Sequence, residues 1–249
     1  MTFVSGKGFD TGTCAEAQPC RTFQFAIGQT SASGEVKVLD PANYGGVTIT
    51  QSISIAGIEG AGIDHGSGNA ITINAGPNDE INLAHLTVDG LKTGGSGIVL
   101  NSGGSLTITH CVVRNFTNTG VFLTPTAGTT QFLIAGTLVS DNGTASIEVI
   151  PLGGSVQGAL DHVSMNKAGL GIGVQSNGNV TVVGSIASNN AGSGFFTEGG
   201  GILRLAHSAA TGNGIGVFNS SGTVVSAGDN FINGNGTDVS GTLTNVSTK

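Results

Sequence analysis

Short segments in which apolar and polar residues alternate recur along the chain, and glycine, asparagine or serine bounds most of them. In the segment GIVLN, Ile98 and Leu100 share one face and Val99 lies on the other, which is the period of two that a β-strand requires. A helical stripe with a period of 3.6 residues does not fit most of the chain, because glycine and threonine recur too often. The pattern therefore predicts many short strands joined by tight turns.

These strands belong to a repeating unit. Segments of similar pattern begin at residues 46, 70, 97, 120, 146, 171, 194 and 216, so successive starts lie 22 to 27 residues apart. Each unit has the same order: this first strand, a second strand such as SLTIT, and a third such as CVVRN. A unit of this length with three short strands is one turn of a β-solenoid, in which each coil stacks on the next.

A polar residue recurs just after the third strand of the unit. The position is occupied by Asn115, Asp141, Asn166 and Asn189, at spacings of 26, 25 and 23 residues. Side chains stacked on adjacent coils lie about 4.8 Å apart and can hydrogen-bond to one another and to the turn backbone. We therefore predict that these four residues form a structural ladder at one corner of the solenoid.

The composition indicates an ordered chain and restricts its partners. Of 249 residues, 44 are glycine, 38% are hydrophobic and only 9% are charged, which is not the composition of a disordered chain. The net charge is −7 and the eight Lys and Arg residues are spread along the chain, so we expect no nucleic-acid partner. We also expect no transmembrane segment, and we recognise no signal peptide in this chain.

The three cysteines have different expected roles. Cys14 and Cys20 bracket a short loop, CAEAQPC, and we predict that they form a disulfide clasp; the alternative is a pair of reduced thiols. A disulfide indicates an oxidising compartment, so we expect a secreted or periplasmic protein. Cys111 falls on an apolar strand, where a buried, inert thiol is expected rather than a nucleophile.

The coils and the corner asparagines resemble the right-handed parallel β-helix proteins of the pectate-lyase-like superfamily. The stretch FVSGKGFDTGTCAEAQPCRTFQFAIGQT is similar to the N-terminal caps of bacterial members, and within it Phe23, Ala26 and Ile27 fall on one face of a short helix. The resemblance implies a single all-β domain, a single-stranded right-handed parallel β-helix of about nine coils at residues 35–236. A cap with a short helix precedes it at 1–34, and a C-terminal strand or tail follows at 237–249. The fold hosts lyases, hydrolases, adhesins and inert scaffolds, so it does not determine an activity.

The resemblance also implies where an enzyme of this kind would act. In pectate-lyase-like enzymes a carboxylate cluster on the outer face of the second strand holds calcium, and an Arg or Lys acts as base. The outward positions of that strand are Asn82, Thr107, Leu133, Thr181 and Arg204, so no carboxylates stack there. Asp161 and His162, in ALDHVSMN, resemble the Trp-Ile-Asp-His stretch of pectate lyases and would make Asp161 a calcium ligand; the alternative is a polar corner.

Two further groups of residues carry possible chemistry. Asp89 and Arg114 fall at equivalent places on adjacent coils, and we expect either an exposed ion pair or, with Lys92, a lyase site in which Arg114 is the base. Three histidines end equivalent strands: His85, His110 and His207. The first two could share a metal ion, but no third ligand is evident. We therefore predict no metal site and no cofactor, with Ca²⁺ expected only if the protein is a lyase.

The most unusual feature is an outward row of apolar residues on the first strand of the unit. Its positions are Thr48, Thr72, Val99, Phe122, Glu148, Gly173, Phe196 and Phe218. A contiguous exposed apolar patch usually marks an interface. The alternatives are that the C-terminal tail TDVSGTLTNVSTK covers the row, or that the true register differs by one residue and turns the rings inward. The absence of Trp and the presence of a single Tyr argue against a dedicated sugar groove.

Two functional hypotheses follow. The first is an exported scaffold or binding protein that acts through a long outer face, by self-association as a homo-oligomer or by binding an extended polymer such as a polysaccharide. Its binding face would contain Phe122, Glu148, Phe196 and Phe218. The competing hypothesis is a polysaccharide lyase or glycoside hydrolase with a site formed by Arg114, Asp89, Asp161 and His162.

Overall fold

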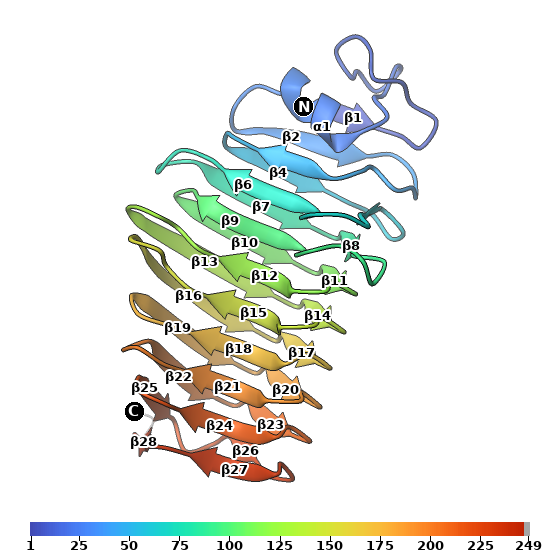
Figure 1. Cartoon of the computed structure of the whole chain (residues 1–249). Helices are drawn as coiled ribbons and strands as arrows, with labels where there is room; N and C mark the ends of the chain where they lie inside the picture. Colours follow the sequence, from blue (N-terminus) through green and yellow to red (C-terminus); the bar gives the residue numbers. More distant parts are fainter. Residues whose placement is uncertain (247–249) are drawn as a thin grey trace.

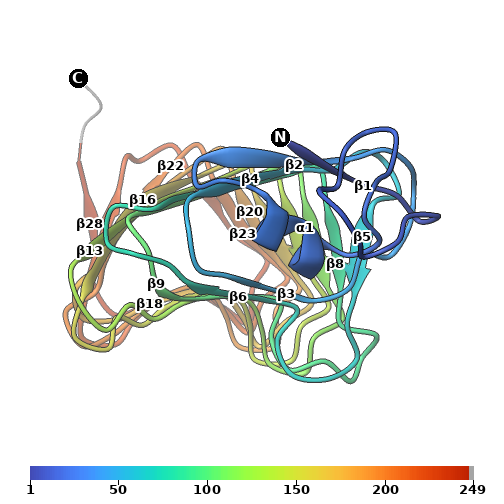
Figure 2. The same cartoon turned by 90° about the horizontal axis from the view of Figure 1, so that it is seen from above.

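Three parallel sheets run along the molecule, and the chain visits them in turn as it coils (Figure 1). The structure is a computed structural model that describes residues 1–246, and within these residues the sheets contain eleven, eight and nine strands. Seen along the stack, the three sheets surround a common interior (Figure 2). The predicted all-β, right-handed parallel β-helix is thereby confirmed.

The eleven-stranded sheet is called sheet A here. Its strands are β1 (Thr2–Val4), β2 (Gly34–Val38), β4 (Ile53–Ala56), β7 (Glu80–Ala84), β10 (Ser105–Thr109), β13 (Thr129–Ala135), β16 (Ser155–Asp161), β19 (Gly178–Val183), β22 (Ile202–Ala206), β25 (Thr223–Ser226) and β28 (Leu243–Asn245).

Sheets B and C complete each coil. Sheet B contains β5 (Gly62–Asp64), β8 (Thr87–Asp89), β11 (Val112–Arg114), β14 (Leu138–Ser140), β17 (Ser164–Asn166), β20 (Ile186–Ser188), β23 (Ala209–Thr211) and β26 (Phe231–Ile232). Sheet C contains β3 (Val47–Ile49), β6 (Ile71–Asn74), β9 (Ile98–Ser102), β12 (Thr119–Leu123), β15 (Ala145–Val149), β18 (Leu170–Val174), β21 (Ser193–Thr197), β24 (Ile215–Asn219) and β27 (Thr237–Ser240). One coil therefore runs through sheets C, A and B in that order.

The observed register agrees with the repeat read from the sequence. The second residues of the eight predicted units pair with one another from coil to coil: Val47, Ile71, Ile98, Val121, Ile147, Ile172, Phe195 and Val217. All eight are buried, so they form one apolar column inside the solenoid. Burying a side chain of this size contributes about 1.5–3 kcal/mol, and the repetition of the column makes the interior of the stack its main source of stability.

The N-terminal cap closes one end of the stack. Helix α1 (Phe23–Gln29) lies over the interior of the first coils (Figure 2), and the three residues predicted to share its inner face, Phe23, Ala26 and Ile27, are buried. The Thr22 side chain caps the helix by accepting a hydrogen bond from the Phe25 amide. In addition, β1 pairs in parallel with β2, so the cap also adds a strand to sheet A, which the sequence pattern did not predict.

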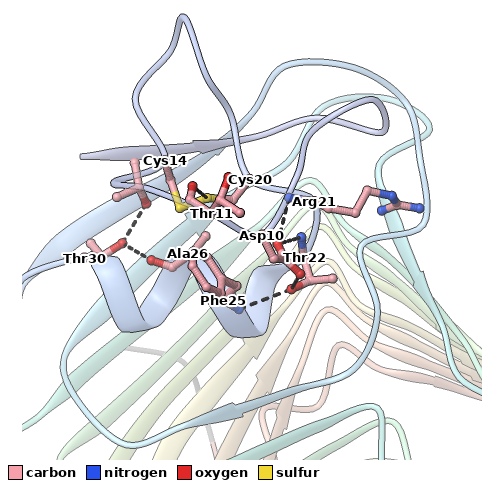
Figure 3. The surroundings of a disulfide bond; sticks show 10 residues. Asp10, Thr11, Cys14, Cys20, Arg21, Thr22, Phe25, Ala26 and Thr30 are labelled. Carbon is pink, nitrogen blue, oxygen red and sulfur yellow. Dashed lines mark hydrogen bonds between the residues drawn. A yellow bond between two sulfur atoms is a disulfide. The ribbon is translucent and has the colours of Figure 1, made fainter.

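A disulfide joins Cys14 to Cys20 beside this helix (Figure 3). Asp10 lies in the same loop, and its carboxylate accepts hydrogen bonds from the backbone amides of Arg21 and Thr22 and from the Thr22 hydroxyl. The disulfide and this carboxylate together fix the loop that leads into α1. The remaining cysteine, Cys111, is buried, and burial raises the pKa of its thiol to about 11, which leaves it uncharged at neutral pH.

A ladder of amide side chains lies one residue after two of the predicted ladder residues, Asp141 and Asn189. It is formed by Asn142, Asn190, Asn213 and Asn235, all at the corner between sheets B and C. The Asn213 Oδ1 atom accepts from the Asn190 backbone amide at 3.0 Å and from Asn190 Nδ2 at 2.9 Å, and Asn235 receives the same pair of bonds from Asn213. Each rung thus satisfies a buried turn amide and links two coils.

The predicted ladder residues have a different role. Asn115, Asp141 and Asn189 occupy the preceding corner position, where their backbone is left-handed with φ values of 62°, 56° and 55°. Asn and Asp tolerate this conformation better than other side chains except glycine. Asn166 lies a further residue earlier, because it pairs with Ser140 at the end of β17. The prediction was therefore wrong for these four residues: three are in exposed or partly exposed left-handed turns, and Asn166 ends a strand.

The amide ladder has a gap at Ala168, which takes the rung position between Asn142 and Asn190. Asn142 is 3% exposed, and its Nδ2 is buried without a hydrogen-bond partner in the described residues. We predict that Ala168→Asn raises the free energy of unfolding by about 1 kcal/mol, because the new amide can bond to both neighbouring rungs. Urea denaturation measures the effect. Ala168→Leu is the control: it adds bulk without hydrogen bonds, and an equal gain from it would contradict the ladder explanation.

A second polar centre ties the cap to the first coil. The Asp40 carboxylate accepts hydrogen bonds from the Ser5 hydroxyl at 2.6 Å, the Gly6 amide at 2.6 Å and the buried Tyr44 hydroxyl at 2.7 Å. The Gly6 amide, with Ser5 and Tyr44, lowers the pKa of Asp40 below its ordinary value of 3.8. Desolvation and the carboxylate raise the pKa of Tyr44, so its hydroxyl remains a donor.

This lowered pKa gives a pH dependence with a defined sign. A carboxylate whose pKa is lower in the folded state stabilises the fold above its unfolded pKa of about 3.9, and this contribution is lost as the pH falls through the folded-state pKa. We expect Asp40→Asn to lower the melting temperature at pH 7 and to reduce its dependence on pH below about 4. Thermal melts from pH 7 to pH 2 test this. Glu16→Gln, at an exposed site, is the control, and an unchanged pH profile in Asp40→Asn would contradict the role of Asp40.

Candidate functional site

The outward row predicted on the first strand of each unit exists on sheet C. Its eight positions pair from coil to coil in the predicted order: Thr48, Thr72, Val99, Phe122, Glu148, Gly173, Phe196 and Phe218. The positions before and after Phe122 and Phe196 are buried, as is Val217 before Phe218, and the three phenyl rings are partly exposed. The alternative register, which would turn these rings inward, is therefore excluded.

The row has an aromatic section and a polar interruption. The rings of Phe196 and Phe218 lie 5.3 Å apart between centroids and are tilted by 36°. Glu148 accepts a hydrogen bond from the Thr119 hydroxyl at 2.6 Å, which holds its carboxylate against the sheet. Gly173 leaves a notch next to it, because a Cβ atom there would only reach ordinary contact with Leu170, Phe196 and Glu148, at 3.4, 3.7 and 3.9 Å. The surface therefore alternates apolar rings with a carboxylate and a recess.

The C-terminal tail does not cover this row in residues 237–246. Strand β27 pairs with β24, so that Ser240 continues the row beyond Phe218, and β28 pairs with β25 in sheet A. This segment thus adds a further coil to the stack instead of folding back across sheet C (Figure 1). The expectation that the tail covers the phenylalanines is wrong for these residues, and residues 247–249 of the tail lie outside the described part of the chain.

Asp89 and Arg114 form the predicted pair between adjacent coils. Arg114 Nε donates to Asp89 Oδ2 at 2.8 Å, and Asn115 Nδ2 donates to both oxygens of the same carboxylate at 3.0 Å. The two partners differ in exposure: Asp89 is buried, at 7% exposed, whereas the Arg114 side chain is 47% exposed. Burial by itself would raise the pKa of Asp89, but hydrogen bonds from the Leu91 amide, Asn115 and Arg114 outweigh it and lower the pKa.

This geometry gives Arg114 the role of a fixed cation. An arginine side chain stays protonated in proteins, and Arg114 Nε lies 2.8 Å from the Asp89 carboxylate. A base must accept a proton, so the ion pair opposes the lyase role considered for Arg114. The arrangement instead holds the guanidinium through Nε, and the side chain is 47% exposed, which suits binding of an anionic group.

Arg114 borders a cleft of about 520 Å³ at the corner between sheets B and C. The cleft lies across consecutive turns between those sheets, and its lining residues are Lys92, Arg114, Asn115, Phe116, Thr117, Asp141, Asn142, Gly143 and Lys167. The structure therefore brings Lys92 close to the Asp89–Arg114 pair, as the sequence analysis considered. Lys167 also lines the cleft and was not among the predicted site residues. Its signal in the sequence is that a lysine stands where equivalent turns have Asn, Asp or Gly.

The other catalytic candidates lie at a different corner. Asp161 ends β16 in sheet A, and His162 follows it in the turn toward sheet B, with Nδ1 2.6 Å from Asp161 Oδ1. Both side chains are exposed, at 51% and 74%. Because Asp89 and Arg114 end strands of sheet B, at the corner between sheets B and C, the four candidate residues do not converge on one site.

Asp161 does not have the partners that calcium requires. Calcium takes six to eight oxygen ligands, mostly from carboxylates and carbonyls. The residues paired with Asp161 on the neighbouring coils are Ala135 and Val183. Among residues 1–246, no group of three or more His, Cys, Asp or Glu side chains is placed to hold a metal ion. The donor set therefore does not fit the calcium site that the resemblance to pectate lyases implied.

The histidines form a structural column at the corner between sheets A and B. The corner position is taken in successive coils by His85, His110, Gly136, His162, Gly184 and His207, and all six have left-handed backbone conformations. The rings of His85 and His110 stack at 5.1 Å with an angle of 12°. Their recurrence is explained by the turn, because histidine tolerates this conformation better than most side chains.

Comparisons with known proteins agree with the fold. The chain matches the crystal structure of a pectate lyase, Pel9A, with a TM-score of 0.58 and 14% sequence identity, over 99% of this chain and 78% of that one. No curated protein shows significant similarity to the sequence. Within the described residues, no helix has the length and apolar character needed to cross a bilayer. Residues 96–247 match the family described as the right-handed beta helix region. The chain therefore belongs to the right-handed β-helix family.

Proposed function

We propose that this protein is a non-catalytic binding protein that holds an extended polysaccharide against the outer face of sheet C. The observation that carries the proposal is the row of outward residues that includes Phe122, Phe196 and Phe218. Equivalent residues of adjacent coils lie about 4.8 Å apart, so the row runs parallel to the axis of the stack; Phe196 and Phe218 are on adjacent coils, and Phe122 is three coils from Phe196. A polymer that lies along the axis would meet an equivalent position at every coil, with exposed or partly exposed side chains at most of them, since Val99 is buried and Gly173 has no side chain.

The row contains Phe and neither Trp nor Tyr, so it is not a dedicated sugar groove, but its apolar surface still fits the apolar ring faces of a sugar polymer. Partly exposed phenyl rings offer flat apolar surfaces, and Glu148 supplies a hydrogen-bond acceptor between them. The fold is one on which a pectate lyase is also built, which supports a polysaccharide as the ligand class. The disulfide of the cap supports a location in an oxidising compartment, outside the cytosol.

The residues considered for catalysis give less support to a lyase or hydrolase. Arg114 is ion-paired with Asp89, and the Asp161–His162 pair lies at another corner of the stack. Within residues 1–246, the outer face of sheet A offers no carboxylate cluster, since its central positions are Asn82, Thr107, Leu133, Ala159, Thr181 and Arg204. Binding without bond cleavage is therefore the function that the geometry favours.

Substitution in the row tests the proposal. We expect Phe196→Ser to weaken binding to the recognised polysaccharide about tenfold, because the variant loses one ring of apolar contact. Affinity electrophoresis through gels that contain each member of a panel of neutral and acidic polysaccharides measures this retardation. Leu133→Ser is the matched control, because Leu133 is a partly exposed apolar residue on the outer face of sheet A.

Three results would contradict the proposal. The first is that no polysaccharide retards the wild-type protein, and the second is that Leu133→Ser weakens binding as much as Phe196→Ser does. The third is an unsaturated or shortened product, detected by ultraviolet absorbance and chromatography, which would make the protein an enzyme. Sedimentation velocity is run in parallel, and a wild-type dimer that Phe196→Ser dissociates would assign the row to self-association instead.

A further inference from the structure

The cleft between sheets B and C has a charge that differs from that of the whole chain. Three of the eight Lys and Arg residues of a protein with a net charge of −7 line this cleft: Lys92, Arg114 and Lys167. The acidic groups there are Asp89, which pairs with Arg114, and Asp141, which lies 3.9 Å from Lys167. Lys92 makes no ion pair within residues 1–246. The net charge of the groups at the cleft is therefore positive, whereas the net charge of the whole chain is negative.

Arg114 is oriented for an oxyanion. Its Nε donates to Asp89, which is itself fixed by Asn115 and by the Leu91 amide. The two terminal nitrogens donate no hydrogen bond to the described residues, and almost half of the side chain is exposed. A guanidinium fixed in this way presents the planar pair of donors that matches the two oxygens of a carboxylate or sulfate group.

Both lysines occupy backbone conformations that are unfavourable for lysine. Lys92 has φ = 64° and Lys167 has φ = 53°, and a side chain with a Cβ atom is strained in this left-handed region. The turns equivalent to that of Lys167 carry residues suited to the region: Asn115, Asp141, Asn189 and Gly212. Strained residues persist where the surrounding structure or a function requires them, and they cluster at binding sites. Lys167 is the one cation among these equivalent turn positions, so its charge is not required by the turn conformation.

The cleft lies beside the row on sheet C. The turn with Thr117 leads within two residues into β12, and the turn with Gly143 leads within two residues into β15. These strands carry Phe122 and Glu148 of the row. The cleft adjoins the N-terminal ends of these strands, and the row crosses them at their fourth residues, so a polymer bound on the row lies on the same strands that begin at the cleft.

From these observations we infer that the cleft bounded by Lys92, Arg114 and Lys167 is an anion-binding subsite for a negatively charged polymer. The groups it takes are oxyanions, either carboxylates of uronic-acid residues or sulfate esters. Arg114 binds two oxygens of one group, and the two lysines stabilise neighbouring charges on adjacent residues of the polymer. This inference rests on the proposed function, since the row supplies the apolar contact and the cleft selects for charge.

The left-handed turns make the test specific. Asn fits the backbone of both lysine positions, so Lys92→Asn and Lys167→Asn should fold and should be as stable as the wild type or more stable. We expect each to weaken binding of polygalacturonate or dextran sulfate about tenfold and to leave binding of neutral dextran unchanged. The dependence of the affinity on salt should also become less steep, because fewer charges are neutralised on binding. Affinity electrophoresis and isothermal titration measure these changes.

The arms of the experiment separate the ligands and the two proposals. If the wild-type protein binds polygalacturonate and not dextran sulfate, the site is assigned to carboxylates. If it binds dextran sulfate and not polygalacturonate, the site is assigned to sulfate esters. Arg204→Gln, at a basic residue on the outer face of sheet A, is the matched control. Unchanged affinity for both charged polymers in the two lysine variants, or an equal loss in Arg204→Gln, would overturn the inference. If the lysine variants lose binding and Phe196→Ser does not, the cleft stands and the role of the row fails.

Discussion

Parallel backbone pairing between adjacent coils is the constraint on which the rest of the molecule depends. It places each residue directly over the equivalent residue of the next coil, about 4.8 Å away, so every position of the repeat becomes a column. Apolar columns fill the interior, the amide ladder occupies the corner between sheets B and C, and the histidines occupy the corner between sheets A and B. Like charges stacked at this spacing repel, which agrees with a chain that has only 9% charged residues.

The columns explain what the sequence could predict. Alternation and the 22 to 27 residue spacing define which residues stack, so the coil register and the outward position of Phe122, Phe196 and Phe218 follow from the pattern. The position of the ladder does not follow from it. Asparagine suits both the left-handed turn residue and the buried rung after it, and a string such as Asn189–Asn190 cannot show which one is inside.

In the candidate site, too, the stacking of strand residues was predictable from the repeat, whereas the placement of turn residues was not. The pairing of Asp89 with Arg114 was predictable, because equivalent strand ends must stack. The burial of Asp89 was not, since it depends on the Asn115 amide and on the path of the turn after β8. Lys167 enters the cleft from the turn two coils beyond that of Arg114, and only its contrast with the Asn, Asp and Gly of equivalent turns signals it in the sequence.

The missing rung at Ala168 also affects how two neighbouring coils are held together. In a solenoid each coil contacts only its neighbours, so the free energy of the whole is close to a sum over successive interfaces. The interface between the coils of β14 and β17 lacks the amide bonds that join the coils of β20 and β23. The coils on its two sides are therefore joined by the backbone pairing of β14 with β17 and by apolar packing of residues such as Val139 and Met165, without a bond between rung side chains.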